Sequence, residues 1–230
     1  MKKLIAIGAT LLAALSLAAC GSSNSGTDNG GKTVESSKNT KTTTKPSKKK
    51  SSSSNEVTNG QLLKVGQWKN DDMQGKMELA KIATINKTLT VSKYSVILKD
   101  FKMFEVTPKD NDQKKLAADS FASSTGVTTP YYEIQIQYAI KNTSANPVQF
   151  NGISSLVTST GQQLDSNGGM SDQGVGAEVA AGATKDTAVQ ALITTSDKDK
   201  LSSITLNFDS FCNTSDFSDL GTLPVTKIDL

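Results

Sequence analysis

The chain has 230 residues, of which 36% are hydrophobic and 20% charged, and its formal net charge is +3. All 25 basic residues are Lys, so the sequence has neither Arg nor His. Without His it contains no Ser/His/Asp or Cys/His catalytic unit and no His-containing zinc site. Without Arg it lacks the guanidinium group that reads guanine and clamps phosphate.

Residues 1–20 predict a lipoprotein signal peptide. Lys2 and Lys3 precede an uncharged run of 16 residues, which is short for a membrane span and typical of a secretory signal. The run ends in Leu-Ala-Ala-Cys-Gly, which resembles the bacterial lipobox. The resemblance implies cleavage after residue 19 and a diacylglyceryl group on Cys20, which anchors the protein to the outer face of the cell membrane. The alternative is an ordinary signal peptide with an incidental Cys.

Residues 20–59 predict a lipidated Cys followed by a disordered tether. Between residues 21 and 59, 17 residues are Ser or Thr and 7 are Lys, with only two appreciably apolar side chains. Such a segment buries too little surface to offset its ordering entropy. Lys48, Lys49 and Lys50 suit an anionic lipid or wall polymer, or simply a solvated linker. Residues 60–230 carry 16 Lys against 19 acids, so this acidic part is not expected to bind nucleic acid.

The segment 60–230 predicts one folded domain built from β-strands. Apolar residues alternate with mostly polar ones from Tyr132 to Ile140, which is the clearest strand pattern in the chain. We expect the other strands at 77–83, 91–106 (one strand or two, broken near residue 99), 148–158, 184–193, 201–208 and 223–228. Asp110 and Gln113 form a cap for a short helix at 114–122, with Ala117 and Phe121 on one face. This pattern predicts an all-β, antiparallel β-sandwich or barrel with one short crossing helix.

The segments YYEIQIQYAIKNTSANPVQFNGISSLVTSTGQQLD and AAGATKDTAVQALITTSDKDKLSSITLNF resemble the immunoglobulin-like domain of unknown function found in Gram-positive surface lipoproteins. The family turns correspond here to Asn142, Gly161 and Ala181-Gly182, and Ala181 stands where the family usually has Pro. The resemblance covers roughly residues 64–210. It implies an immunoglobulin-like two-sheet sandwich, similar to that of a secreted immunoprotective antigen, and it implies no catalytic residues.

Candidate sites are few. No G-x-S-x-G motif is present, and the S-x-x-K at Ser47–Lys50 lies in the predicted tether. Asp165–Asp172 offers oxygen ligands for calcium, but its composition is also that of a turn. Cys212 is expected to be a small buried hydrophobe rather than a reactive thiol. Tyr131 and Tyr132 must point to opposite faces of their strand, which leaves one of them exposed. Trp68 and that tyrosine are candidates for a carbohydrate or peptide groove, or they cover the edge of the sandwich.

These observations favour a non-enzymatic, extracytoplasmic lipoprotein with no cofactor and no assigned metal ligand. Its partners are expected to be the membrane, through the lipid, and an envelope protein or wall polymer, through loops or a sheet edge. The alternative is a solute-binding lipoprotein of a transporter or sensor. An enzyme that relies on carboxylates alone would need paired acids in a cleft.

Overall fold

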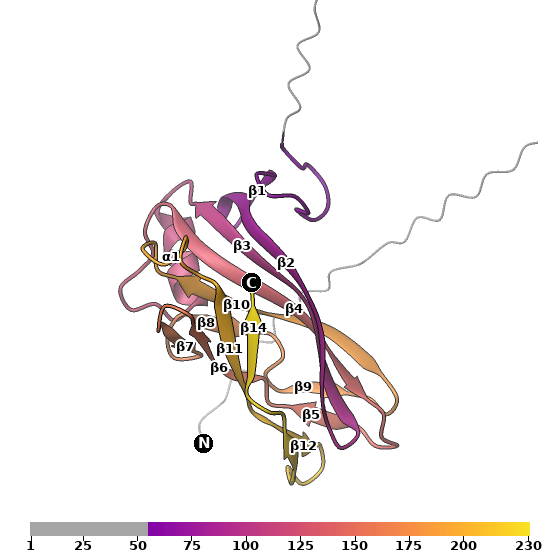
Figure 1. The fold of residues 1–230 in the computed structure, drawn as a ribbon. Coiled ribbons are helices and arrows are strands. Elements are labelled where there is room, and N and C mark those ends of the chain that lie inside the picture. Colours follow the sequence, from indigo (N-terminus) through magenta and orange to yellow (C-terminus); the bar gives the residue numbers. More distant parts are fainter. Residues whose placement is uncertain (1–54) are drawn as a thin grey trace, which may run out of the picture. The chain divides into compact units, whose positions relative to one another are not determined.

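The computed structural model describes residues 55–230; the predicted signal peptide, Cys20 and the tether up to residue 54 lie outside this part. Almost every element is a β-strand, all pairing between named strands is antiparallel, and one short helix interrupts the series (Figure 1). This confirms the all-β, sandwich-like fold. None of the helical structure within 55–230 has the length and hydropathy needed to cross a bilayer.

The first layer is a six-stranded sheet with the strand order β1-β2-β3-β4-β10-β8. The predicted break near residue 99 is a bulge within one continuous strand, between Leu98 and Asp100. The strands are β1 (Trp68–Asp71), β2 (Gly75–Val91), β3 (Tyr94–Thr107), β4 (Tyr131–Asn142), β10 (Thr184–Ile193) and β8 (Met170–Asp172).

The second layer consists of two four-stranded sheets, ordered β14-β11-β6-β7 and β13-β12-β5-β9. The prediction of a single strand at 148–158 is wrong in one respect, because this segment divides into two strands at Asn151-Gly152. Gly152 has φ +94°, and a Cβ there would meet the side chains of Val175 and Asp172. The strands are β14 (Thr226–Asp229), β11 (Ser203–Phe208), β6 (Ile153–Thr158), β7 (Gln163–Asp165), β13 (Asp219–Thr222), β12 (Ser210–Asn213), β5 (Val148–Phe150) and β9 (Ala177–Val179).

The main core lies between the two layers. As the alternation predicts, Ile134, Ile136 and Ile140 of β4 face inward and are at most 1% exposed. They belong to one cluster with apolar residues of β5, β6, β11 and β12. Phe150 and Phe211 lie in this cluster with ring centroids 4.7 Å apart, which joins β5 to β12. An aromatic pair of this kind contributes about 0.5–1.5 kcal/mol beyond its buried area.

Asn142, at the end of β4, links two of the turns that carry the family resemblance. It is fully buried, and its Nδ2 donates to the backbone oxygens of Asn146, Val179 and Ala180. Its Oδ1 accepts a hydrogen bond from the Ser144 N–H. The Asn142 side-chain amide therefore provides hydrogen-bond partners for backbone groups of its own turn and of the segment that leads into Ala181-Gly182.

The helix predicted at 114–122 is present as α1 (Asn111–Ser120), which begins three residues and ends two residues earlier than predicted. Asp110 is its N-cap and accepts a hydrogen bond from the Gln113 N–H at 2.9 Å. Ala117 and Phe121 are buried, as predicted.

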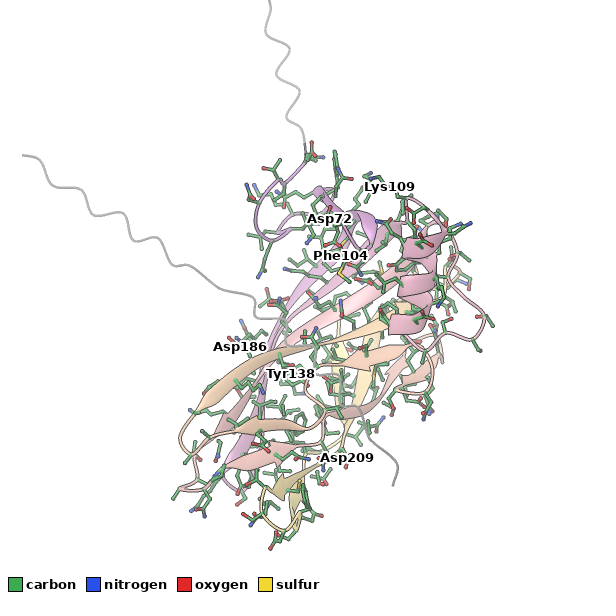
Figure 2. The ribbon with its side chains drawn as sticks, turned by 180° about the vertical axis from the view of Figure 1, so that it is seen from behind. Asp72, Phe104, Lys109, Tyr138, Asp186 and Asp209 are labelled. Carbon is green, nitrogen blue, oxygen red and sulfur yellow. The ribbon has the colours of Figure 1, made fainter. Side chains whose placement is uncertain are left out.

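The helix contributes to a second, smaller core on the outer face of the six-stranded sheet. Figure 2 shows Phe104, which belongs to this core, beside the turn that carries Asp72 and near α1. The cluster consists of Leu62, Met77, Leu79, Phe104, Val106, Ala117 and Tyr131, with Val57, Ile82, Val127 and Leu192 packed against it. The outer face of a predicted two-layer sandwich is thus partly covered by the helix and by the segment that precedes β1.

Strand β2 extends well beyond its pairing with β1. On the β1 side of β2, backbone hydrogen bonds extend as far as Leu79. From residue 80 to 91, β2 pairs only with β3 among the described residues. The register with β3 shifts twice along this edge, after Leu79 and after Thr84. Lys81 and Lys87 reach from it to the Leu201 and Lys227 carbonyl oxygens of the second layer, at 2.8 and 3.4 Å. The edge is therefore irregular and carries charge.

Candidate binding site

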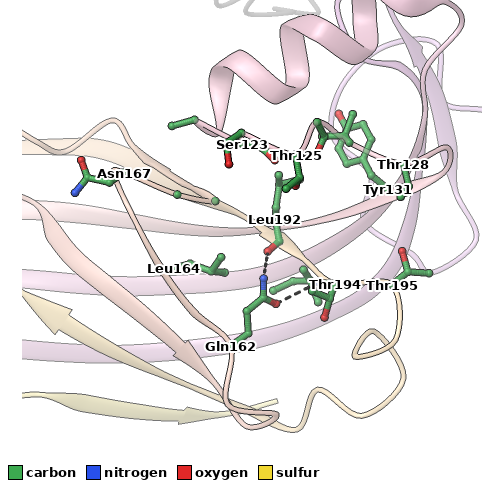
Figure 3. A pocket seen from close by; sticks show the side chains of 17 residues that line it. Ser123, Thr125, Thr128, Tyr131, Gln162, Leu164, Asn167, Leu192, Thr194 and Thr195 are labelled. Atoms are coloured by element: carbon green, nitrogen blue, oxygen red, sulfur yellow. Dashed lines mark hydrogen bonds between the residues drawn. The ribbon is translucent and has the colours of Figure 1, made fainter.

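A pocket of about 420 Å³ lies where α1 leads into β4 (Figure 3). One wall is the loop of residues 122–128, which follows the helix. The opposite side is formed by the end of β10 with Thr194 and Thr195, and by Gln162, Leu164 and the turn before β8. Leu164 and Ile193 are buried, whereas Ser124, Thr125 and Thr195 are exposed. The pocket therefore has an apolar floor and an open polar rim.

The lining of this pocket contains no charged side chain. Its polar atoms are hydroxyls and side-chain amides, which donate and accept hydrogen bonds without carrying charge. Tyr131 also lines it, and the pKa of its hydroxyl is raised, first by burial and then by the nearby Glu133 carboxylate, so it stays neutral. The polar lining residues are Ser123, Ser124, Thr125, Thr128, Tyr131, Gln162, Asn167, Thr194 and Thr195.

The rim is held by hydrogen bonds from three directions. Gln162 Nε2 donates to the Leu192 carbonyl oxygen at 3.1 Å, and its Oε1 accepts from the Thr194 N–H at 3.2 Å (Figure 3). The Gly169 N–H donates to the Phe121 oxygen, and the Leu192 N–H donates to the Gly169 oxygen, both at 2.7 Å. Gly169 has φ +83°, and a Cβ there would meet Leu164 Cδ2 at 2.3 Å. The helix end, the β7–β8 turn and β10 are thus fixed relative to one another.

Several polar groups of the rim remain available to a ligand. The hydroxyls of Ser124, Thr125 and Thr195 and the side-chain amide of Asn167 make no hydrogen bond within residues 55–230. By contrast, the Ser123 and Thr128 hydroxyls donate to the Gly126 and Pro130 oxygens at 2.8 and 2.7 Å. The free groups can bind a neutral polar molecule across the apolar floor. The lining residues offer no base to activate a hydroxyl as a nucleophile.

The two adjacent tyrosines are on opposite faces, as predicted: Tyr132 lies in the main core and Tyr131 in the smaller one. The prediction that one of them is exposed is wrong, since they are only 3% and 5% exposed. The cause is the cover on the outer face, which alternation along a single strand does not reveal. Trp68 is half-buried in β1, with the Lys76 ammonium 5.3 Å from its ring centre, and it does not line the pocket.

The aspartates singled out as possible calcium ligands have structural roles. Asp172 accepts hydrogen bonds from Tyr138 Oη at 2.7 Å, the Ile153 N–H at 2.6 Å and the Gly174 N–H at 2.9 Å. Asp165 accepts from the Asn167 N–H within its own turn. No cluster of three or more metal-ligating side chains occurs in the part of the chain that the structure describes.

Cys212 is buried, which confirms that prediction, and its sulfur lies 3.8 Å from Asn151 Oδ1. Cys20 lies outside the described residues. The sequence reasoning missed the pocket residues, because runs such as Ser-Ser-Thr-Gly-Val-Thr-Thr at 123–129 have the ordinary composition of a loop. What distinguishes them is the partner surface of Gln162 and β10, which only the folded chain brings together.

No protein-family model matches the chain, and no curated protein matches it. Among solved structures, it is similar to a functionally unknown protein from Listeria monocytogenes EGD-e. The sequence identity is 12% and the TM-score 0.44, over 67% of this chain and 86% of the other.

Proposed function

We propose that the protein is a lipoprotein of a Gram-positive bacterium, anchored through Cys20 to the outer face of the cell membrane. Its immunoglobulin-like domain binds an uncharged, hydroxyl-rich stretch of a cell-wall polymer in the pocket and catalyses no reaction on it. The proposal for the anchor depends on the lipobox and the Ser/Thr/Lys segment of the sequence. The observation that carries the proposal for binding is the uncharged, hydroxyl-rich lining of the pocket.

The chemistry of the lining favours such a ligand over an acidic one. An anionic polymer gains most from fixed cations, and the lining provides none. A sugar chain presents hydroxyls that both donate and accept, which matches the Ser, Thr, Asn and Gln groups of the rim. Its apolar ring faces can lie on Leu164, Val127 and Leu192. The exposed rim also lets a polymer continue beyond the pocket, whereas a free solute is usually enclosed more fully.

The anchor is tested by replacing Cys20 with Ala and separating membranes from soluble material. The unmodified chain is expected in the membrane fraction and the variant outside it, because two acyl chains hold a protein almost permanently. If the variant still fractionates with membranes, the lipid anchor at Cys20 is refuted.

Binding is tested with isolated wall polymer and a triple variant that removes hydroxyls without changing shape: Ser124→Ala, Thr125→Val and Thr195→Val. Each lost hydrogen bond contributes about 0.5–1.5 kcal/mol, so the variant should bind roughly 10- to 1000-fold more weakly. The matched control is Thr88→Val, Thr184→Val and Ser215→Ala, three exposed hydroxyl residues that do not line the pocket. Equal affinity of the two triple variants would refute the pocket as the binding site, as would failure of the unmodified chain to bind any wall polymer.

A further inference from the structure

A lysine is buried on the outer face of the six-stranded sheet without an acidic partner. Lys102 of β3 is only 3% exposed. Its ammonium donates to Gln61 Oε1 at 3.0 Å, and none of the ion pairs within residues 55–230 includes it. The one acceptor is neutral, so the positive charge and the remaining N–H donors of the ammonium are left uncompensated. A buried charge of this kind is costly, and a negatively charged ligand that pairs with it would remove that cost.

A cavity of about 180 Å³ lies at this lysine, between residues 60–62 and the sheet. Lys102 lines it, and Leu62, Met77 and Phe104, which is labelled in Figure 2, give it an apolar wall. A cavity of about 150 Å³ holds one benzene molecule, so this volume suits a ligand of about six heavy atoms. The remaining lining residues are Gly60, Gln61, Lys69, Gln74, Gln135, Gln137 and Gln190.

Three neighbouring glutamines of the sheet bring free amides to the same cavity. Gln135 of β4 lies directly opposite Lys102, and Gln190 of β10 lies directly opposite Gln135. Directly opposite side chains have Cβ atoms about 4.5–5.5 Å apart. Gln137 lies two residues further along β4, on the same face. The side-chain amides of these three glutamines make no hydrogen bond within residues 55–230, so their N–H groups are available to a ligand in the cavity.

The charge of the cavity lining is positive. The lining contains two lysines and no acidic residue. Lys69 lies 3.9 Å from the Asp71 carboxylate, whereas Lys102 has no such partner among the described residues. Asp100 and Glu133 lie on the same face of the sheet but do not line the cavity, and burial raises the pKa of Glu133 to about 7, so below that pH it is mainly neutral. One positive charge is therefore left for a ligand.

We propose that this cavity binds a small monocarboxylic acid in its ionised form. The carboxylate of the ligand pairs with the Lys102 ammonium and accepts hydrogen bonds from the amides of Gln135 and Gln190. Its short apolar tail lies against Met77 and Phe104. A carboxylate carries the single negative charge that the lining can compensate, whereas a phosphate group carries more charge near neutral pH and has no apolar part to cover the wall.

The test is calorimetric titration of the purified full chain at pH 6 with three probes: butyrate, butyramide, which has nearly the same shape but no charge, and inorganic phosphate. Butyrate is expected to bind at least about tenfold more tightly than butyramide, because the amide leaves the buried ammonium unpaired. Absence of butyrate binding at millimolar concentration overturns the proposal. Equal binding of butyramide also overturns it, because the site would then recognise shape without charge. Tighter binding of phosphate than of butyrate refutes the carboxylic acid as the class of ligand.

Variants assign the binding to this cavity. Lys102→Met keeps the length and apolar stem of the side chain and should weaken butyrate binding by at least about tenfold. The control Lys93→Met changes an exposed lysine of the β2–β3 turn and should bind as the unmodified chain does. Circular dichroism checks the fold, and if Lys102→Met does not fold, Gln190→Leu takes its place and should weaken binding roughly two- to tenfold through the loss of one hydrogen bond. Unchanged binding by the folded variant refutes the site. Binding at the hydroxyl-lined pocket is independent of this result.

Discussion

Replacing Glu133 with Gln is expected to change how the stability of the domain depends on pH. The pKa of Glu133 is raised from 4.5 to about 7. Burial is the main cause, and Asp71 adds to it, whereas the hydrogen bond from Gln74 and the positive charge of Lys69 oppose it. Gln has nearly the same shape, can accept the same hydrogen bond from Gln74 and does not titrate.

The direction follows from proton binding in the folded and unfolded states. Below pH 4.5 Glu133 is protonated in both states, so its titration costs no stability. Between pH 4.5 and about 7 the unfolded chain loses this proton while the folded chain keeps it, so the free energy of unfolding falls as the pH rises. At about 1.4 kcal/mol per pH unit, the loss reaches about 3 kcal/mol above pH 7. For a domain of this size, that corresponds to about 6–12 °C in Tm.

The measurement is chemical denaturation of the unmodified chain and of Glu133→Gln at intervals from pH 4 to pH 8. The stability difference between them should move by about 3 kcal/mol in favour of the variant as the pH rises. Other carboxyl groups cancel in this difference. Glu178→Gln, which changes an exposed residue of β9, serves as the control and should follow the unmodified chain. If the curve of Glu133→Gln also runs parallel to that of the unmodified chain, the reasoning about Glu133 is refuted.

Three further predictions concern structural side chains. Asn142→Ala should lower the free energy of unfolding by about 2–4 kcal/mol in denaturant titrations, because the amide bonds two turns. Gly174→Ala should lower the free energy of unfolding by more than about 2 kcal/mol, because the new Cβ would lie 1.8 Å from Tyr138 Oη. The control Gly168→Ala should change the free energy of unfolding little, because its Cβ would meet nothing within 4 Å. In a Cys20→Ala background, Cys212 should react with a thiol reagent only after denaturation, since it is buried; rapid reaction of the native chain would contradict its burial.

Local patterns in the sequence predict much of the strand layer and the helix. The alternation from Tyr132 to Ile140 predicts β4, and the pairing of Asp110 with Gln113 predicts the N-cap of α1, because both signals depend on neighbouring residues alone. The helix itself begins directly after that cap, at Asn111 rather than at residue 114. The break at Gly152 escapes such reasoning. It depends on Asp172 and Val175, which approach from another part of the chain.

The burial of the outer face could not be predicted for a related reason. Glu133 sits on the polar side of an alternating strand, where a two-layer sandwich exposes its residues to water. In the folded chain, residues of α1 and of the segment near Leu62 cover that face, and Glu133 becomes fully buried. The candidate pocket likewise joins residues 122–128 to Gln162 and Thr195, which share no sequence pattern.

The irregular edge of β2 has a consequence for how copies of the chain meet one another. An open strand is a template on which a second copy can add its own strand, and repeated addition leads to fibres. The two register shifts after Leu79 and Thr84 interrupt the straight row of backbone groups that such growth requires. Lys81 and Lys87 place positive charge along the same row, so two copies meeting there would repel each other. Copies of the chain can therefore meet at high concentration and remain separate molecules.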